Sequence, residues 1–421
     1  MDTRKLEYFN HWWIKGKVDL ELALTFKRDV YNEIKARLDS RFIIALTGLR
    51  RVGKSTIMYQ LIDDLISNGV DATDILFFSF DESNVSVNEV IKAYTEFHKK
   101  DLREKRAYIF LDEIQKCKNW ENEVKIYYDI YPKLKIIVSG SESLFIRKRS
   151  KETLSGRVFE FKIDPFSFSE YLKINGVNKK EFIYETKILP YFYKYIAYGG
   201  FPETFKFNSE KDFREYIRAL VVDRIIYQDT PRIFHIDDPD FLRMLFELVA
   251  SNPGLYIDYQ SIGREFGKDR RVVRDYFRYL EESFLIRTLV NYRKSSASKL
   301  RKLKRAYPTD NAFIHLYRPD FDEEFKGKLV ETAVVNALKA DAFWKSSKEV
   351  DIVLEGKPIE VKYQESLREE DLKAIIKFMS RFDEKEGVVL TKNDEMSISI
   401  RDKTIKLIPV HKLLLYGRMI I

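Results

Sequence analysis

Short, continuous apolar runs alternate with amphipathic stretches in the first part of the chain. The runs lie at residues 42–47, 75–80, 108–111, 135–140 and 157–163. Apolar runs of about four to eight residues, separated by helical stretches, are typical of parallel strands that are buried on both faces. The pattern therefore predicts an α/β core with a parallel sheet over residues 41–165.

The pattern of apolar and polar residues also predicts the boundaries of the other segments. Residues 1–40 are interpreted as a polar arm that leads into a helix, and residues 166–250, which are rich in aromatic residues, as a helical lid. Residues 251–295 are predicted to form a helix-turn-helix followed by a short strand, as in a winged helix. Residues 296–421 return to mixed strand and helix. We expect three or four domains, because domains usually contain about 100–200 residues.

Composition limits the class of protein. Hydrophobic residues make up 45% of the chain and aromatic residues 14%, which excludes wholesale disorder. No stretch approaches the roughly 18 apolar residues that a membrane span needs, and the first residues lack an apolar signal core. Cys117 is the single cysteine, which excludes a disulfide framework. We therefore expect a cytoplasmic protein with no membrane partner.

The net charge of +8 is unevenly distributed. Residues 264–305 hold 14 basic and five acidic residues, so this window contains the excess of positive charge. A focused positive charge indicates a polyanionic partner such as DNA. The alternative interpretation is the charged surface of a thermophilic protein.

The segment GLRRVGKS (48–55) fits the pattern G-x-x-x-x-G-K-S/T and lies between an apolar strand and an amphipathic helix. Its backbone amides and the helix N-terminus would hold the β-phosphate of a nucleotide. Lys54 would reach the β- and γ-phosphates, and Ser55 would bind Mg²⁺. The segment therefore predicts ATP and Mg²⁺ as ligands. The predicted nucleotide-binding residues here are Gly48, Arg51, Gly53, Lys54, Ser55 and Thr56.

Two further strands end in polar residues that suit ATP hydrolysis. The strand at 108–111 is followed by Asp112, which would hold Mg²⁺ through water, and by Glu113, which would orient or deprotonate the attacking water. Ser139 ends the next strand, where its hydroxyl would touch the γ-phosphate or the water, or would simply cap the strand. We select Arg157 to neutralise charge on the transferring phosphoryl group, with a surface cation as the alternative.

The most basic part of the chain predicts a helix suited to DNA. Residues 259–267 are expected to form one helix and residues 270–282 a second. The second has an apolar stripe at helical spacing, with cations on its other faces, as a recognition helix requires. The alternative is a contact between domains. The stripe consists of Val273, Tyr276, Phe277 and Leu280, and the predicted DNA-binding residues are Arg270, Arg271, Arg274 and Arg278.

A second group of carboxylates lies near the C-terminus. Glu360 and Lys362 stand two residues apart on a predicted strand, so both project from the same face. Asp351 begins the preceding strand, and Glu331 lies on a helix that could pack on this sheet. Converging carboxylates repel one another unless a hard cation such as Mg²⁺ neutralises them. A metal-bound water loses its proton more easily, and Lys362 could position that water.

Five motifs occur in an order that resembles a known family: GLRRVGKST, FLDEIQK, IIVSGSESL, LSGRVFEFKIDPFSFSEYL and YGGFPE. The chain resembles AAA-type ATPases, mostly archaeal and bacterial, that join a P-loop NTPase sheet and helical lid to a winged helix and a C-terminal PD-(D/E)XK domain, which is restriction-endonuclease-like. The resemblance begins near residue 25. It implies an ATPase site formed by Lys54, Ser55, Asp112, Glu113 and a serine near 139–141. It also implies a nuclease site with the metal-associated residues Glu331, Asp351 and Glu360 and the catalytic residue Lys362.

These patterns together predict a P-loop ATPase whose nucleotide state controls a C-terminal domain that binds and cleaves DNA. By analogy with related nucleases, branched or structured DNA is the candidate substrate. The alternative is a nucleotide-switched signalling or regulatory ATPase in which the C-terminal domain is an inert docking module. An arginine acting in trans would require a homo-oligomer.

Overall fold

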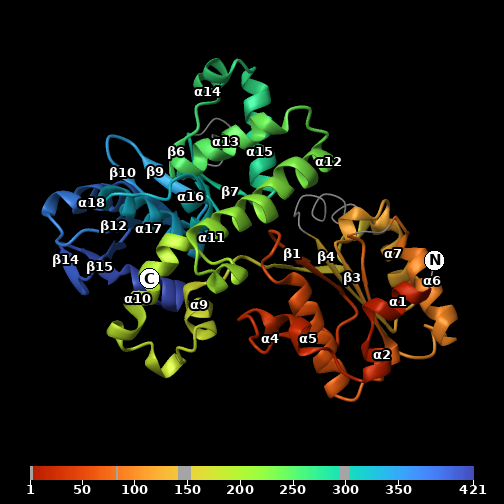
Figure 1. Ribbon diagram of the computed structural model, residues 1–421. Helices are drawn as coiled ribbons and strands as arrows, with labels where there is room; N and C mark the ends of the chain where they lie inside the picture. The colour runs from red at the N-terminus through yellow and green to blue at the C-terminus, as the bar shows by residue number, and fades with distance from the viewer. Residues whose placement is uncertain (1–2, 82–83, 141–152, 294–302) are drawn as a thin grey trace. The chain divides into compact units, whose positions relative to one another are not determined.

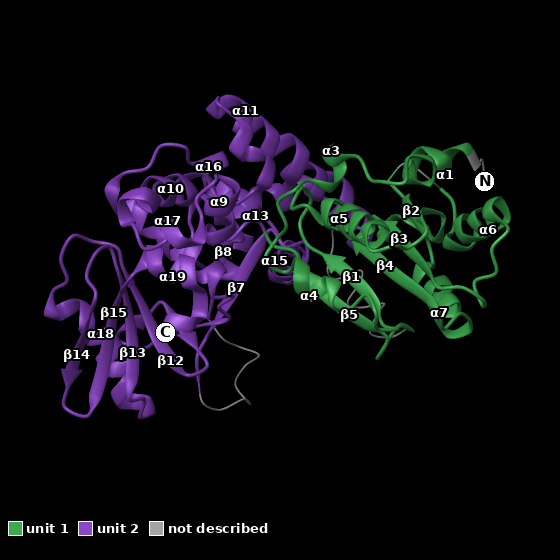
Figure 2. Ribbon diagram, turned by 90° about the horizontal axis from the view of Figure 1, so that it is seen from below, with its two compact units in different colours: residues 1–164 green, residues 165–421 purple. Residues whose placement is uncertain are grey.

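The computed structural model describes residues 3–81, 84–140, 153–293 and 303–421. The chain divides into two compact units, which comprise residues 1–164 and 165–421 (Figure 2). Within the described ranges, no helix combines the length and the apolar character that crossing a membrane requires.

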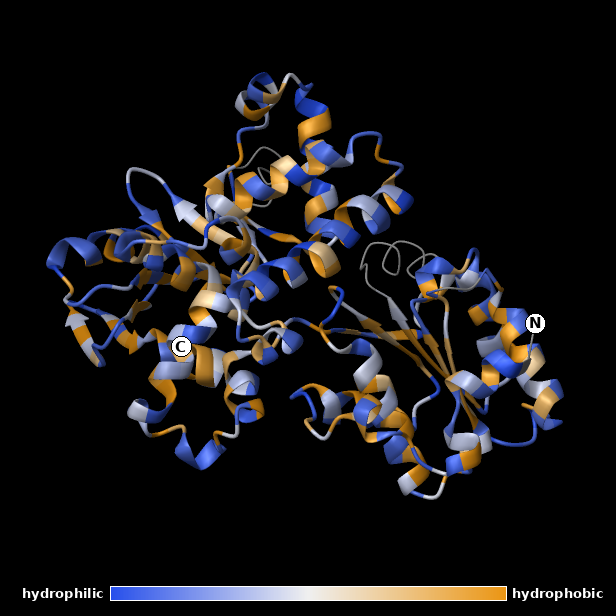
Figure 3. Cartoon of the chain, in the orientation of Figure 1, coloured by the Kyte–Doolittle hydropathy of each residue, from blue (hydrophilic) through white to orange (hydrophobic). Residues whose placement is uncertain are grey.

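Unit 1 is built on a five-stranded sheet in which every neighbouring pair is parallel, in the order β2-β3-β4-β1-β5. Figure 1 labels β1, β3 and β4 of this sheet, and Figure 2 labels all five strands. The strands are β1 (Ile43–Thr47), β2 (Ile75–Ser79), β3 (Ala107–Asp112), β4 (Leu134–Gly140) and β5 (Val158–Lys162). Four of them are almost wholly buried, as their apolar runs predict, and Figure 3 shows these strands as largely hydrophobic. The predicted mixed α/β fold with a parallel sheet is therefore confirmed.

Helices connect and cover these strands. They are α5 (Lys54–Ser67), α6 (Val87–His98) and α7 (Trp120–Ile130). Val90 of α6 and Val124 of α7 share an apolar core with Ile109 and Leu111 of β3. These helices therefore hold β3 from one face and fix the position of the carboxylates at its end.

The N-terminal arm belongs to unit 1 and packs along the edge strand β2. Its short helices are α1 (Thr3–Phe9), α2 (Trp12–Lys15), α3 (Leu20–Ala23) and α4 (Tyr31–Lys35). The Asn10 side chain accepts a hydrogen bond from the Phe77 amide at 2.6 Å and donates one to the Phe77 carbonyl at 2.9 Å. The Trp13 indole donates to the Ile75 carbonyl at 2.8 Å. The arm thus satisfies backbone groups that an open sheet edge would leave exposed.

Unit 2 contains two five-stranded sheets. The first has the order β10-β9-β7-β8-β6 and the second the order β11-β12-β13-β15-β14. The strands of the first are β6 (Leu255–Tyr256), β7 (Ile286–Asn291), β8 (Lys304–Pro308), β9 (Ala342–Lys345) and β10 (Glu349–Val350). Those of the second are β11 (Ile352–Leu354), β12 (Lys357–Lys362), β13 (Glu386–Thr391), β14 (Met396–Ile400) and β15 (Lys403–Pro409).

The helices of unit 2 surround these sheets. They are α9 (Phe168–Ile174), α10 (Glu185–Tyr198), α11 (Glu210–Tyr216), α12 (Thr230–Phe234), α13 (Pro239–Ser251), α14 (Tyr259–Phe266), α15 (Arg270–Glu282), α16 (Asn311–Tyr317), α17 (Glu323–Ala337), α18 (Glu369–Phe382) and α19 (Val410–Tyr416). Between α11 and α12 the chain is π-helical at Ile217–Val222 and Ile225–Asp229.

Two predicted domain boundaries divide structures that the fold keeps together. β8 lies beyond the predicted boundary at 295/296, yet it pairs antiparallel with both β6 and β7. The segment 166–250, predicted as a lid, begins with α9 and α10, whose Phe168 and Phe192 share one core with Val334 of α17 and Leu413 of α19. The first part of the predicted lid therefore belongs to the core of unit 2, because its aromatic residues pack in the same apolar cluster as α17 and α19.

The motif YGGFPE (198–203) begins at the end of α10 and is hydrogen-bonded to Asp310, just before α16. The Gly200 amide donates to Asp310 Oδ2 at 3.0 Å, and the Ala312 amide donates to Asp310 Oδ1 at 2.8 Å. Burial raises the pKa of Asp310 to about 7. Gly199 has a φ of +76°, and a Cβ there would lie 1.8 Å from Asp310 Oδ1. Gly199 thus allows the chain to pass close to a buried carboxylate.

Candidate nucleotide-binding site and a buried carboxylate cluster

The carboxyl ends of the unit 1 strands bring polar residues together. In the parallel register, Thr47 lies opposite Gly140, and Ser79 lies opposite Asp112. Ser139 donates a hydrogen bond from its hydroxyl to Asp112 Oδ1. Ligands of open parallel sheets bind at this edge, where the strands end. The predicted residues Asp112 and Ser139 are therefore adjacent at the expected edge of the sheet.

The loop at 48–53 has the backbone that a phosphate-binding loop needs. Gly48 has a φ of +146°, and a Cβ there would lie 2.1 Å from the Ile163 carbonyl oxygen. Gly53 has a φ of +94° and is the N-cap of α5, so the N-terminus of this 14-residue helix adjoins the loop. A helix N-terminus attracts phosphate through its free amides and its dipole.

Lys54 and Ser55 extend the loop toward Asp112. The buried Lys54 ammonium donates to the Gly48 carbonyl at 3.1 Å and to the Leu49 carbonyl at 2.7 Å. The Ser55 hydroxyl donates to Asp112 Oδ2 at 2.7 Å. Hydroxyl and carboxylate oxygens are the ligands that Mg²⁺ prefers, so Ser55 and Asp112 fit the predicted magnesium position. The lysine lies inside the loop, where a phosphate could take the place of the carbonyls.

Glu113 is held beside this group in an uncommon backbone conformation. Its φ is +51°, in the left-handed region, and its amide donates to the Ser139 hydroxyl oxygen at 3.3 Å. The Gln115 side-chain amide donates to Glu113 Oε2 at 2.6 Å. Such conformations cost on the order of 1–3 kcal/mol and concentrate at functional sites. The carboxylate is thereby oriented within its own loop.

The other residues predicted to bind the nucleotide lie in different parts of unit 1. Thr56 lies in the first turn of α5, and Arg51 is exposed on the loop with a φ of +65°. Arg157 precedes β5, and its carbonyl accepts a hydrogen bond from Ile43 at the start of β1. Ser141, the other serine of the predicted cluster, lies outside the described residues.

The prediction for Arg157 is wrong within its own chain, because this residue lies at the amino edge of the sheet. β5 runs parallel to β1, with Val158 opposite Ile43 and Lys162 opposite Thr47. The phosphate loop follows Thr47, so the length of a strand separates it from Arg157. The guanidinium instead pairs with Asp129 at 3.1 Å.

Helix α15 presents its two faces as predicted. The apolar stripe is buried, and the arginines on the other faces are exposed. Asp269 caps the helix by accepting a hydrogen bond from the Arg271 amide at 2.7 Å. The buried residues are Val273, Tyr276, Phe277 and Leu280, and the exposed cations are Arg270, Arg271, Arg274 and Arg278. The cations therefore remain accessible to a polyanion along the helix.

The C-terminal carboxylates converge, and a buried arginine lies among them. Arg305 Nη2 lies 2.6 Å from Glu331 Oε1, and Arg305 Nη1 lies 3.6 Å from Asp351 Oδ1. The same Nη1 lies 2.9 Å from Glu349 Oε1. The Tyr307 hydroxyl also donates to Glu331 Oε1, at 2.6 Å. The predicted convergence of Glu331 and Asp351 is thus present, with a cation of the chain itself between them.

Glu360 and Lys362 complete this cluster from β12. Lys362 Nζ lies 2.7 Å from Glu360 Oε1, and the Asp351 amide donates to Glu360 Oε2 at 3.4 Å. Burial raises the pKa of Glu360 to about 8, and the charge of Asp351 adds to this effect. Burial also raises the pKa of Asp351 to about 6, with a further contribution from Glu331. Burial would raise the pKa of Glu331 too, but the charges of Arg305 and Lys328 hold it below its ordinary value.

The geometry of this cluster disagrees with the predicted Mg²⁺ site at Glu331, Asp351 and Glu360. In the part of the chain that the structure describes, no group of three or more His, Cys, Asp or Glu side chains is placed to hold a metal ion. The sequence also missed Arg305 and Glu349. Arg305 was one of the 14 basic residues of the window 264–305, whose charge indicated a polyanionic partner, whereas its side chain is only 3% exposed. Its place in the strand segment RAYP (305–308) was the available signal for burial.

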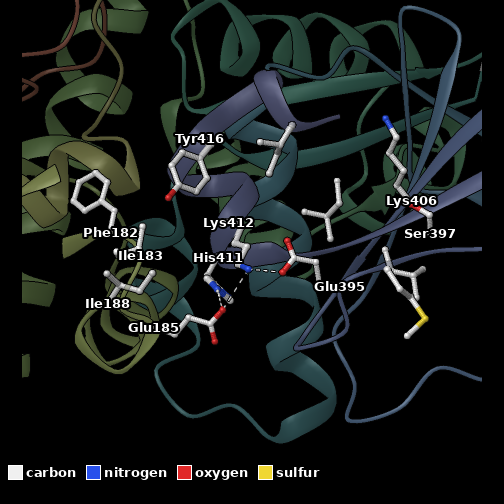
Figure 4. Close-up of a pocket in the computed structure, with 14 residues that line it drawn as sticks. Phe182, Ile183, Glu185, Ile188, Glu395, Ser397, Lys406, His411, Lys412 and Tyr416 are labelled. Atoms are coloured by element: carbon white, nitrogen blue, oxygen red, sulfur yellow. Dashed lines mark hydrogen bonds and ion pairs between the residues drawn. The ribbon is translucent and has the colours of Figure 1, made fainter. Parts of the chain in front are cut away.

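A separate cavity of about 510 Å³ lies in unit 2 (Figure 4). Its wall combines apolar residues such as Ile183 and Ile188 with a polar group around His411. Lys412 pairs with Glu395 at 2.5 Å and with Glu185 at 3.5 Å, so charges in the wall neutralise one another. None of the predicted site residues lines this cavity.

Three families match successive parts of the chain. Residues 40–172 match a family described as an AAA domain. Residues 189–322 and 326–413 match two families described as domains of unknown function, DUF8612 and DUF4143. The first match covers the sheet and the phosphate loop of unit 1.

Similar proteins occur in archaea and bacteria. The chain is 25% identical over 421 residues to the uncharacterized protein MJ1544 of Methanocaldococcus jannaschii, which covers 93% of this chain and 92% of that protein. It is 23% identical over 300 residues to an uncharacterized protein of Haemophilus influenzae, which covers 69% of this chain and 72% of that protein.

Among solved structures, a complex of S. cerevisiae Hsp104 with casein has a TM-score of 0.27 and 13% identity, over 41% of this chain and 32% of that one. The C. elegans protein PCH-2 has a TM-score of 0.25 and 11% identity, over 42% and 52%. The AAA match and the geometry of the loop together identify residues 40–172 as a P-loop ATPase-like domain of the AAA type.

Proposed function

We propose that the chain binds and hydrolyses Mg²⁺–ATP at the carboxyl edge of the unit 1 sheet. One observation carries the proposal: Ser55, Asp112 and Ser139 form a continuous hydrogen-bonded group beside the phosphate loop. A structural turn would need no such group, whereas phosphoryl transfer depends on positioned cations and hydrogen-bond donors.

Each residue of this group has a separate role in the proposed reaction. Lys54 exchanges the two loop carbonyls for phosphate oxygens, and the loop amides hold the β-phosphate. Ser55 and Asp112 would hold Mg²⁺, which supplies positive charge next to the β- and γ-phosphates when it is bound. Glu113 accepts a proton from the attacking water, and Ser139 keeps the Glu113 amide in place.

A binding measurement tests the first part of the proposal. Lys54→Ala removes the cation that neutralises the phosphates, so we expect ATP affinity to fall at least about tenfold, or about 1.4 kcal/mol. Equilibrium titration with a fluorescent ATP analogue would measure this loss. Lys27→Ala is a suitable control, because that lysine pairs with Asp64 on the far part of α5. Equal affinities of Lys54→Ala and the unaltered protein would contradict the assignment of the loop.

We also propose that unit 2 binds DNA through α15, as the recognition helix of a winged helix. The segment has the order α13, β6, α14, α15, β7, β8, with β7 and β8 antiparallel. The supporting observation is the exposure of the α15 arginines opposite a fully packed apolar face. Arginines at phosphates add affinity that falls as salt rises.

The DNA proposal predicts the salt dependence of binding. Replacing Arg270, Arg274 and Arg278 by glutamine is expected to reduce the slope of log K against log salt by about 2–3, since each phosphate contact contributes about 0.9. Fluorescence anisotropy of labelled duplex DNA at several salt concentrations would measure the slope. The matched control is the replacement by glutamine of Lys373, Lys377 and Arg381. These residues have the same spacing along the chain and lie on the exposed face of α18. Equal slopes for both variants would refute a role for α15.

DNA cleavage is not part of the proposed function. The predicted nuclease mechanism needs a metal ion at the C-terminal carboxylates, and Arg305 lies there instead. The geometry therefore favours the interpretation of this domain as a module that does not cut DNA.

A further inference from the structure

The guanidinium of Arg305 lies at the point where three carboxylates converge. Two of its nitrogens contact Glu331, Glu349 and Asp351 at 2.6, 2.9 and 3.6 Å. The third nitrogen, Nε, donates to the Gly254 carbonyl at 3.1 Å. Nε and Nη2 thus donate hydrogen bonds within unit 2, while Nη1 lies in ion-pair contact with Glu349 and Asp351. The side chain is only 3% exposed.

The surroundings hold this side chain in place on its remaining sides. The rings of Tyr256, Tyr307 and Phe343 lie 5.6, 5.2 and 5.8 Å from the guanidinium carbon. The hydroxyl of Tyr256 donates to Glu349, and that of Tyr307 donates to Glu331. A Cβ at Gly254 would lie 2.5 Å from Arg305 Nη2, so the absence of a side chain at Gly254 makes room for the guanidinium. The site is therefore built around arginine.

A divalent metal ion does not fit the same position. Magnesium requires oxygen ligands at about 2.0–2.1 Å in an octahedral arrangement. Two of the carboxylates it would use, Glu331 and Asp351, already face the arginine, and Glu360 pairs with Lys362 at 2.7 Å. A second cation beside a buried guanidinium would be repelled strongly in a medium of low dielectric constant. Removing the guanidinium would in turn leave buried carboxylates without a partner.

We infer that Arg305 is the permanent counter-cation of Glu331, Glu349 and Asp351, so that the C-terminal domain binds no divalent metal there and does not hydrolyse DNA. The cluster then joins β8, α17 and the β10–β11 segment into one structure through charge pairs. This inference does not depend on ATP hydrolysis in unit 1.

Metal-directed cleavage of the protein backbone tests the inference on the full chain. Fe²⁺ takes Mg²⁺ sites that are built from oxygen, and with ascorbate and peroxide it generates hydroxyl radicals that cut the nearby backbone. Mass spectrometry of the fragments then shows where metal was bound. We expect no cuts near residues 331, 349–351 and 360 in the unaltered protein. Fragments ending at these positions would overturn the inference. Cuts near residues 48–56 and 112 have different masses, so the two sites are read separately.

Two substitutions of the arginine extend the test. Arg305→Lys keeps the positive charge and is expected to show no cuts at the cluster. Arg305→Met removes the charge at similar length, and we expect it to gain cuts at the cluster that excess Mg²⁺ suppresses. A folded Arg305→Met protein without such cuts would contradict the inference. If this variant fails to fold, the unaltered protein and Arg305→Lys decide the question.

Incubation with DNA provides an independent readout. We expect the unaltered protein to leave duplex, single-stranded and four-way DNA intact in Mg²⁺ or Mn²⁺, with or without ATP. Cutting that Glu360→Gln abolishes would overturn the inference.

Discussion

Replacing Glu113 by glutamine is expected to lower kcat for ATP hydrolysis by about 10²–10³-fold while ATP affinity stays within about a factor of two. Glutamine keeps the size and the hydrogen-bonding geometry of the side chain, but it cannot accept the proton of the attacking water. The phosphate contacts come from Lys54 and the loop, which the substitution leaves unaltered. A phosphate-release assay at saturating Mg²⁺–ATP would measure kcat, and the fluorescent nucleotide titration would measure affinity.

Glu96→Gln is a matched control for this experiment. Glu96 is exposed in the last turn of α6, where it lies 3.9 Å from Lys92, and the chain leads from there to the start of β3, at the edge of the sheet opposite to the site. Its substitution should leave kcat unchanged. If Glu113→Gln retained full turnover, another group would have to take the proton, and the role assigned to the segment 112–113 would fail. If it lost affinity as well as turnover, Glu113 would instead contribute to nucleotide binding.

The nucleotide site of unit 1 could be predicted from the sequence because each of its parts follows a strand. Apolar runs gave the strands, and the residue after each run lies at the carboxyl edge of a parallel sheet. Asp112 and Ser139 are adjacent for this reason. The same rule explains why the prediction for Arg157 is wrong, since this residue stands at the beginning of the run 157–163 and thus at the opposite edge of the sheet. The direction of the strand therefore determines whether a residue lies at the edge that holds the site, as Asp112 does, or at the opposite edge, as Arg157 does.

The C-terminal cluster shows what the sequence could not supply. The spacing of Glu360 and Lys362 predicted one strand face, and their 2.7 Å contact agrees with it. Arg305 lies 26 residues before Glu331, in a basic run that resembles a solvated surface. Its burial follows from the pairing of β8 with β6 and β7, which is a long-range contact. Local patterns do not determine which distant strand covers a charged residue, so the cation at the centre of the cluster was missed.

Gly200→Ala is expected to destabilise unit 2 by about 3 kcal/mol or more. A Cβ at this position would lie 2.3 Å from the Phe166 carbonyl oxygen and 3.0 Å from the Phe166 amide nitrogen. These are backbone atoms in the hydrogen-bonded pair that joins Phe166 to Gly200 at 2.7 Å, so they cannot move as a flexible side chain would. Overpacking of a fixed contact costs on the order of 1–3 kcal/mol, and loss of the hydrogen bonds around Asp310 adds to this.

Calorimetry would measure the effect of Gly200→Ala as a fall in the transition temperature of unit 2 by about 10 °C, since about 1 kcal/mol shifts a unit of this size by roughly 2–4 °C. Gly327→Ala is the matched control, because this glycine lies inside α17 and a Cβ there would meet no atom within 4 Å. Alanine favours a helix by about 0.5–1 kcal/mol over glycine, so the control should raise the transition temperature. Opposite shifts for the two substitutions would show that close backbone contact, and not glycine content, makes YGGFPE necessary to unit 2. A stable Gly200→Ala protein would show that the segment can separate from Phe166 without cost.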